Sequence, residues 1–459
     1  MSPPNPTRRP HAVKPQSWPT WLATCALALT ACAPSEDGQD AAVTETRRQP
    51  VDLASIDAAR QLLVTDVSVV DDTFYTQWTQ RTAAEEQLDG DASSPGAAGG
   101  WSFGRLIDNM LPQSLYQKYK DKGRSLFVLR WLRTWEVDQH INGQRVPARP
   151  LIGSLVIDPW RAASGCTGSD EDCQLDFSKA PFRLLAIVYR PDLRKVPSVD
   201  DPGRAGEGRF IFGVIGPDGA RKPFTVIFEY ALPISKKVDI LTWADRYQAL
   251  GQYPFGAEYN AKLFAVTNEF TKRNAAPHQA NGSALLQLRT NEIPLSPADP
   301  QEWELREFVI GSSGFLTPDT VKQEVDAALN GSQALGDWAA QNASAILDGT
   351  HEVPVTWQGA PFLAAAAPVP EGGSWQVPGV TEDVRHAFAL ATCSGCHKAE
   401  TGANFLHVRT REVGTASPVS AFLAGELAAG ARVADFHRLL NVADAEQIQS
   451  GKRRDHGHK

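Results

Sequence analysis

Hydrophobic and polar side chains alternate along several short runs in the middle of the chain, which is the pattern of half-buried β-strands. Clusters of Gly, Pro and Asp separate these runs, and Pro217-Asp218-Gly219 is a turn between two of them. Consecutive strands joined by short turns favour an antiparallel sheet or sandwich. The pattern predicts strands over residues 151–157, 184–190, 209–215, 224–230, 284–290 and 302–310.

A further extended run precedes most of these strands. Large apolar residues at alternate positions between Phe127 and Val137 share one face if residues 125–137 are extended. Asn142-Gly143 follows, and these residue types supply the positive φ angles that a tight hairpin turn requires. We therefore expect a β-hairpin in this region.

Apolar residues spaced three and four apart predict helices between and around the strands. Thr317-Pro318 has the residue types of an N-cap followed by Pro at the first helical position, so we expect a helix from there to about residue 329. The other helices are expected over residues 54–64, 73–88, 103–119, 241–250, 257–273 and 332–347. Tryptophans in this part of the chain are expected to pack in the core, namely Trp131, Trp135, Trp160, Trp243 and Trp303.

A stretch rich in Pro, Ala and Gly at residues 360–380 indicates a domain boundary. It separates a domain at residues 51–359 from a helical segment at 381–451, whose first helix Thr381 is expected to cap. The predicted fold class is therefore α+β, with a large antiparallel β-sheet or sandwich domain with inserted helices, followed by a small α-helical segment. Residues 452–459 form a basic tail that we expect to be disordered.

The N-terminus has a basic stretch and then an apolar run, Trp21 to Ala31, that is too short to span a bilayer and suits a secretion signal. The run ends in Leu29-Thr30-Ala31-Cys32, which resembles the lipobox of bacterial lipoprotein precursors. That resemblance implies removal of residues 1–31, lipidation of Cys32 and, because Asp does not follow the cysteine, retention in the outer membrane. A polar tether at residues 32–50 would then join the anchor to the domain. A cleaved soluble signal, or a fortuitous apolar run, is the alternative.

Charge narrows the range of partners. The chain has 45 basic and 53 acidic residues, and the signal segment removes three basic ones, which leaves 42 against 53 and a net charge of −11. Such a surface argues against nucleic acid as a partner. Because no P-loop or His-Glu-x-x-His motif occurs, a redox carrier or a binding protein is favoured over an enzyme.

The pentapeptide Cys393-Ser394-Gly395-Cys396-His397 has the order Cys-x-x-Cys-His. Two thiols at this spacing can add to the two vinyl groups of a haem while the adjacent imidazole ligates the iron. The segment resembles the haem-attachment site of c-type cytochromes, and the likeness covers this motif and the helix before it. It implies an exported redox protein that carries one covalent haem c on Cys393, Cys396 and His397.

The sixth ligand of the iron would decide the chemistry. No Met follows the motif, and Met110 is expected in a helical core. His407 is the first candidate, because a ten-residue segment reaches about 33 Å when extended and apolar residues flank this histidine. His437 and His386 are the next candidates. Two imidazoles suit electron transfer, whereas an open position would allow peroxide or small-gas chemistry, for which Arg409 and Arg411 lie nearby in sequence.

Cys166 and Cys173 are the two cysteines that remain after the signal, the lipid anchor and the motif are assigned. They bracket a polar turn of six residues, and we expect them to form a disulfide in an oxidising compartment.

These observations predict a membrane-anchored envelope lipoprotein that binds one covalent c-type haem and transfers electrons to a redox partner protein. The alternative is a non-haem envelope lipoprotein with a partner-binding or structural β domain. In that case Cys393 and Cys396 form a disulfide, or bind zinc with His397 or His407.

Overall fold

The computed structural model describes residues 49–80, 95–112, 114–115, 121–199, 201–216, 218–299 and 302–451. All of them belong to one unit that runs from Arg48 to Lys459. The predicted signal segment, Cys32 and the basic tail lie outside the described residues, as do parts of the helices expected over 73–88 and 103–119.

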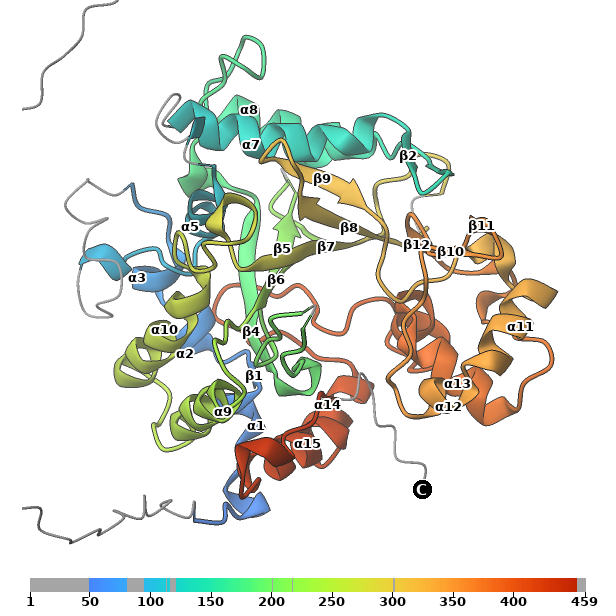
Figure 1. The fold of residues 1–459 in the computed structure, drawn as a ribbon. Coiled ribbons are helices and arrows are strands. Elements are labelled where there is room, and N and C mark those ends of the chain that lie inside the picture. The colour runs from blue at the N-terminus through green and yellow to red at the C-terminus, as the bar shows by residue number, and fades with distance from the viewer. Residues whose placement is uncertain are drawn as a thin grey trace, which may run out of the picture. The chain divides into compact units, whose positions relative to one another are not determined.

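An eight-stranded sheet lies at the centre of this unit (Figure 1). Every strand pair in it is antiparallel, and aromatic residues face each other across the strands, as Phe210 does with Phe228. The predicted antiparallel sheet is therefore confirmed. In spatial order the strands are β1 (Leu63–Val64), β4 (Phe182–Arg190), β5 (Glu207–Ile215), β6 (Arg221–Ala231), β7 (Leu285–Glu292), β8 (Glu304–Ile310) and β12 (Ala367–Pro368), with β9 (Leu316–Asp319) paired to β8.

One face of the sheet is covered by helices and carries most of the core. Its aromatic side chains interlock; for example, the rings of Phe103 and Phe182 stack with centroids 4.1 Å apart. The predicted core tryptophans are all buried. Four of them and Met110 lie in this core, whereas Trp303 belongs to a separate cluster that includes Cys393. The covering helices are α5 (Phe103–Met110), α7 (Asp121–Arg133), α9 (Asp239–Leu250) and α10 (Ala257–Thr271).

The C-terminal helices pack in two different places (Figure 1). Helices α11 (Gln333–Gln341), α12 (Ala343–Leu347) and α13 (Glu382–Ala391) surround a separate small core that includes Trp338 and Phe388. By contrast, α15 (Ala431–Leu440) follows α14 (Ala421–Ala428) and packs against α9 in the large core. Residues 381–451 therefore share no single core, and β12, inside the expected connector, pairs with the main sheet.

The strand expected at residues 125–137 is wrong, because these residues form α7 and a 3₁₀ turn, Thr134–Glu136. Their alternation misleads because the residues between the expected positions, such as Val128 and Leu132, are buried as well. A helix buried on several sides has no polar stripe that would set its period. The strand expected at 151–157 is also wrong, since a π-helical turn, Gly153–Ile157, runs into α8 (Asp158–Ala163).

The hairpin turn was predicted correctly. Asn142 and Gly143 have φ angles of 48° and 73° and connect β2 (Gln139–Ile141) to β3 (Gln144–Val146). In contrast, the helix expected to begin at Thr317-Pro318 is wrong, because both residues lie in β9, at the edge of the sheet, where Pro is tolerated.

The N-terminal region of the described chain contains short elements instead of the continuous helix expected at 54–64. They are a 3₁₀ turn, Leu53–Ser55, and α1 (Ala58–Gln61), which precede β1 in the chain, and α2 (Val67–Val70) and α3 (Thr73–Thr76), which follow it. Each begins after an aspartate whose side chain accepts a backbone N–H, as Asp57 does from Ala59. A further small hairpin pairs β10 (Thr356–Trp357) with β11 (Ala360–Pro361).

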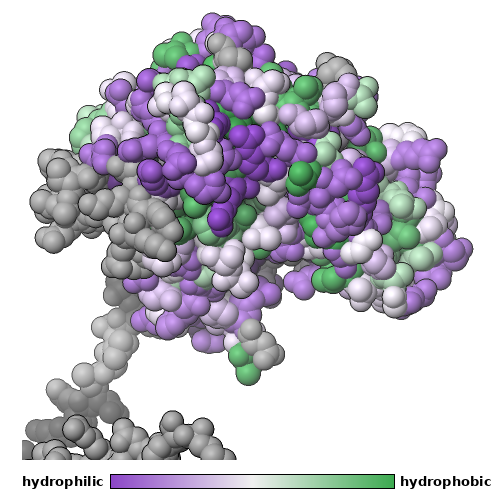
Figure 2. Space-filling view, turned by 90° about the horizontal axis from the view of Figure 1, so that it is seen from above, coloured by the Kyte–Doolittle hydropathy of each residue, from purple (hydrophilic) through white to green (hydrophobic). Residues whose placement is uncertain are grey.

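Cys166 and Cys173 form the predicted disulfide, with their Cα atoms 5.1 Å apart. No helix among the described residues is long and apolar enough to cross a bilayer. On the face shown in Figure 2, hydrophilic residues predominate and hydrophobic ones form small patches.

Candidate functional site

A cavity of about 640 Å³ lies against the second face of the sheet. The face itself forms one wall, and segments near residues 322, 350, 393–408 and 432 form the others. Cys393, Cys396, His397 and His407 all line it. The structure therefore brings the three motif residues and the first candidate for the sixth ligand together on one cavity.

The motif begins where α13 ends. After Ala391 the chain turns at Thr392, whose hydroxyl accepts the Gly395 N–H at 3.0 Å, and a π-helical turn, Gly395–Ala399, follows. A side chain at residue 395 would overlap the carbonyl oxygen of Ala389, so only glycine fits between the two cysteines at this close approach. Both cysteines are buried and are present as thiols.

Glu324 holds the start of this turn. Its fully buried carboxylate accepts the N–H of Cys393 at 2.6 Å, the N–H of Ser394 at 3.2 Å and the Ser394 hydroxyl at 2.5 Å. Burial raises the pKa of Glu324 to about 7, against the opposing effect of these hydrogen bonds. Trp375 donates its indole N–H to the same hydroxyl at 2.9 Å, so the motif is tied to the small helical core.

The His397 ring is held by the backbone of Phe405. Nδ1 of His397 lies 2.6 Å from the Phe405 carbonyl oxygen, and the Phe405 N–H donates to the His397 carbonyl at 2.8 Å. Because a carbonyl can only accept, Nδ1 carries the proton and the lone pair is on Nε2, which is the arrangement of a metal-binding histidine. Phe405 has φ 73°, a strained value for an aromatic residue, and this conformation directs its carbonyl at the ring.

Aromatic rings also pack around His397. The Trp303 ring lies against the imidazole with centroids 5.6 Å apart and a 23° angle between the planes. Phe405 stacks on the same indole at an equal distance.

His407 lies against Cys396 and His397. Its Nε2 is 3.3 Å from Sγ of Cys396, and its Nδ1 is 2.8 Å from the Ser420 hydroxyl. Its ring meets that of His397 edge to face, with centroids 4.7 Å apart. This contact leaves no room for a porphyrin plane between the two imidazoles, so His407 as a sixth ligand would require the rings to separate.

The other ligand candidates lie elsewhere. His437 makes a hydrogen bond through Nε2 with the Val51 carbonyl, and His386 pairs with Glu400. Arg411 is buried and binds Asp71 together with backbone carbonyls of distant segments. None of these three lines the cavity.

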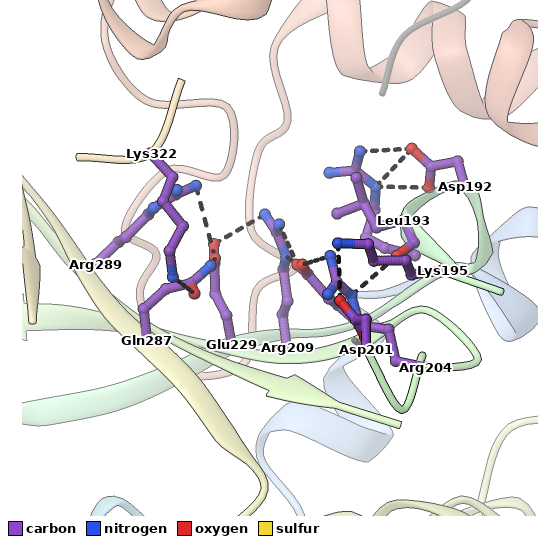
Figure 3. A network of polar contacts seen from close by, with 12 residues as sticks. Asp192, Leu193, Lys195, Asp201, Arg204, Arg209, Glu229, Gln287, Arg289 and Lys322 are labelled. Atoms are coloured by element: carbon purple, nitrogen blue, oxygen red, sulfur yellow. Dashed lines mark hydrogen bonds and ion pairs between the residues drawn. The ribbon is translucent and has the colours of Figure 1, made fainter. Parts of the chain in front are cut away.

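The sheet wall of the cavity carries a row of alternating charges (Figure 3). Glu229 on β6 lies between Arg209 on β5, at 3.0 Å, and Arg289 on β7, at 3.6 Å. Glu307 on β8 lies between Arg289, at 2.8 Å, and Lys322, at 3.3 Å. Each carboxylate is nearly fully buried, and each is shared by two cations, which offsets the cost of removing it from water.

A c-type haem fits most features of this site. The volume is in the range of sites that enclose a small ligand, the two thiols and the Nδ1-protonated His397 lie on one wall, and arginines on the sheet wall suit carboxylate groups such as haem propionates. Among the described residues, no group of three or more His, Cys, Asp and Glu side chains is arranged to hold a metal ion.

Sequence reasoning missed Glu324, Trp303 as a neighbour of the imidazole, and the charged row. A signal for the row exists, because charged residues stand inside predicted strands at positions such as Arg209 and Glu229. Alternation alone assigns such residues to a solvated face, since it does not show what covers them.

Comparison with known proteins finds no relative of this chain. No protein-family model, no curated protein and no solved structure matches the chain.

Proposed function

We propose that this protein carries one covalent haem c in the cavity and serves as an electron-transfer protein of the bacterial envelope, anchored through a lipid on Cys32. The observation that supports this most is the hydrogen bond from Nδ1 of His397 to the Phe405 carbonyl, on the wall that also holds both thiols. A proton on Nδ1 puts the lone pair on Nε2, the atom that ligates haem iron, and the accepting carbonyl belongs to a residue with a strained backbone conformation.

Each residue of the motif has a defined role in this proposal. Cys393 and Cys396 hold the haem by thioether bonds, and His397 is the proximal ligand. Bound haem supplies a one-electron couple. Electron transfer to a partner protein is favoured over peroxide chemistry, because the nearby Arg411 is occupied by Asp71 and by backbone carbonyls.

The test is covalent haem content. The mature chain should be produced in cells with a cytochrome maturation system, denatured, and measured by a pyridine haemochrome spectrum and by intact mass. We expect one haem per chain, and complete loss of covalent haem in the Cys393→Ala, Cys396→Ala double variant. Cys166→Ala is the matched control, because it removes a cysteine from the disulfide and should leave the haem in place. A colourless wild-type chain with the mass of its amino acids and lipid would contradict the proposal.

The anchor is tested separately. Replacement of Cys32 by Ser should release the protein from the membrane fraction and remove the mass of the acyl chains. Haem content should not change, because Cys32 lies outside the motif.

One observation favours the non-haem alternative. Sγ of Cys396 and Nε2 of His407 lie 3.3 Å apart, as two ligands of one zinc ion can. Metal analysis of the purified chain distinguishes the two cases: iron equal to haem supports the first proposal, whereas one zinc per chain that is lost in His407→Ala supports the second.

A further inference from the structure

The cavity has a charge opposite to that of the whole protein. The chain has a net charge of −8, yet the cavity lining contains twice as many basic residues as acidic ones. The acidic residues are Asp192, Glu207, Glu229 and Glu352, and the basic ones are Arg190, Arg194, Lys195, Arg204, Arg209, Arg289, Lys322 and Arg432.

Arg432 differs from the other basic residues of this lining. Each of the others has a carboxylate within 4 Å. For Arg432, none of the described residues places a carboxylate within that distance, and none accepts a hydrogen bond from its guanidinium group. A half-buried guanidinium with five donors and no acceptor is a binding element for an anion.

The acids closest to Arg432 are engaged by other groups. Asp192 accepts three hydrogen bonds from Arg190, at 2.8 Å, 3.1 Å and 2.5 Å, which use both of its oxygens. Glu426 accepts the backbone N–H of Arg432. Burial, and next the Arg190 guanidinium, lower the pKa of Arg432 to about 9, as expected where positive charge exceeds negative charge.

This end of the cavity lies several strands away from Cys393. Arg289 on β7 is the strand residue whose charge interacts with Cys393, and Arg190 lies on β4. Three strand spacings separate β7 from β4, which is about 14 Å. A ligand held at the thiols would have to extend along the sheet to reach Arg432.

We infer that Arg432, with Arg190 and Arg209, forms a binding site for a carboxylate or phosphate group at this end of the cavity. The anion has two sources. One is the propionate groups of haem, which lie on the half of the porphyrin away from the vinyl carbons; this case rests on the proposed function. The other is a free organic or inorganic anion that enters the cavity from solution.

The first arm of the test uses the chain without haem. Wild-type protein made in cells that lack cytochrome maturation, and the Cys393→Ala, Cys396→Ala variant, should be titrated calorimetrically with succinate and with inorganic phosphate. We expect binding of at least one anion, weakened about tenfold to a hundredfold by Arg432→Gln, because a hydrogen bond to a charged group contributes this much. Arg438→Gln is the matched control, since Arg438 is on the same helix, largely exposed, and outside the cavity.

The second arm uses the haem-loaded chain and separates the sources. If propionates occupy the site, loaded protein binds neither anion, and Arg432→Gln moves the pH dependence of the reduction potential to higher pH, because a propionate loses a cation that favours its ionised form. If a free anion is the ligand, loaded protein binds it and Arg432→Gln weakens that binding.

Equal behaviour of Arg432→Gln and Arg438→Gln in every measurement would overturn the inference, and so would the absence of anion binding by the haem-free chain. A chain that never acquires haem, but whose anion binding still depends on Arg432, would disprove the proposed function and leave this inference standing.

Discussion

The two faces of the central sheet use the same strands for different purposes. Neighbouring residues on β6 show the contrast: Phe228 points into the aromatic core, Ile227 lines the cavity, and Glu229 belongs to the charged row. One face is packed with aromatic rings and covered by helices. The other is polar, and a cavity separates much of it from the segments that cover it.

Within a single strand, residues on one face therefore stabilise the fold, and residues on the other face line the cavity. Because side chains alternate between faces, the aromatic residues can hold the fold while their neighbours carry charge. Substitutions on the two faces should therefore give effects of different size and kind, and such substitutions test the comparison.

The largest effect is expected on the aromatic face. Phe228→Ala should lower the free energy of unfolding by about 3–5 kcal/mol, because it removes a fully buried ring and leaves a cavity. Ile227→Ala, one residue earlier, should cost about 1–2 kcal/mol, since its side chain is partly buried beside existing space. Urea denaturation of both variants would measure this, and equal losses would contradict the contrast between the faces.

The second largest loss of stability is expected for substitutions in the charged row. Glu229→Gln leaves Arg209 and Arg289 without their shared buried carboxylate, and we expect a loss of about 3 kcal/mol. The loss should be smaller in Glu229→Gln combined with Arg209→Gln than the sum of the single variants, because the pair is removed together. A double-mutant cycle by urea denaturation measures this, and additive losses would show that the row does not act as a unit.

Glu324 should change the free energy of unfolding by a similar amount, but in a way that depends on pH. In the unfolded chain this carboxyl loses its proton near 4.5, whereas in the folded protein it keeps it until about 7. Folding therefore takes up a proton between these values. The contribution of Glu324 to stability is fully present below pH 4.5 and falls by about 3 kcal/mol as pH rises to 7. Glu292, whose pKa burial also raises to about 7, contributes in the same direction.

Glu324→Gln should remove one of these two contributions. Denaturation curves of wild type and variant at intervals between pH 4.5 and 8 would show a shallower fall for the variant. Parallel curves would mean that Glu324 does not retain its proton in the folded protein.

The smallest effect is expected at the exposed end of the row. Lys322 bridges Glu307 at 3.3 Å, but its side chain is 48 % exposed, so solvent screens the ion pair. Lys322→Ala should change the free energy of unfolding by no more than about 1 kcal/mol. A loss as large as that of Glu229→Gln would show that the row is buried along its whole length.

Sequence patterns were sufficient for the parts of the fold in which one period dominates. Strands β4 to β8, helices α9 and α10, and the turn at Asn142-Gly143 follow from alternation, helical spacing and turn chemistry. The pattern failed where burial removed the contrast, as in α7, and where Thr317-Pro318 was compatible with both a helix start and an edge strand. Tertiary packing decided those cases.

The candidate site divides in the same way. A local motif was enough to select Cys393, Cys396 and His397 as candidates. Loop length predicts only that His407 can reach the opposite face of a haem, whereas the structure places it against Cys396 and the His397 ring. The opposite wall comes from six strands, so its residues are far apart in sequence and become a group only when the sheet forms. Glu324 was unpredictable for a similar reason, because it is 69 residues from the cysteine whose N–H it accepts.

Arg411 connects two parts of the chain that are far apart in sequence. Its partner Asp71 lies 340 residues earlier, so the segment that follows the motif cannot be fastened until nearly the whole chain has been synthesised. A nascent or truncated chain that ends before residue 411 lacks this clasp. Such a chain keeps Cys393 and Cys396 but loses the ion pair that joins the segment after them to the N-terminal part of the described chain.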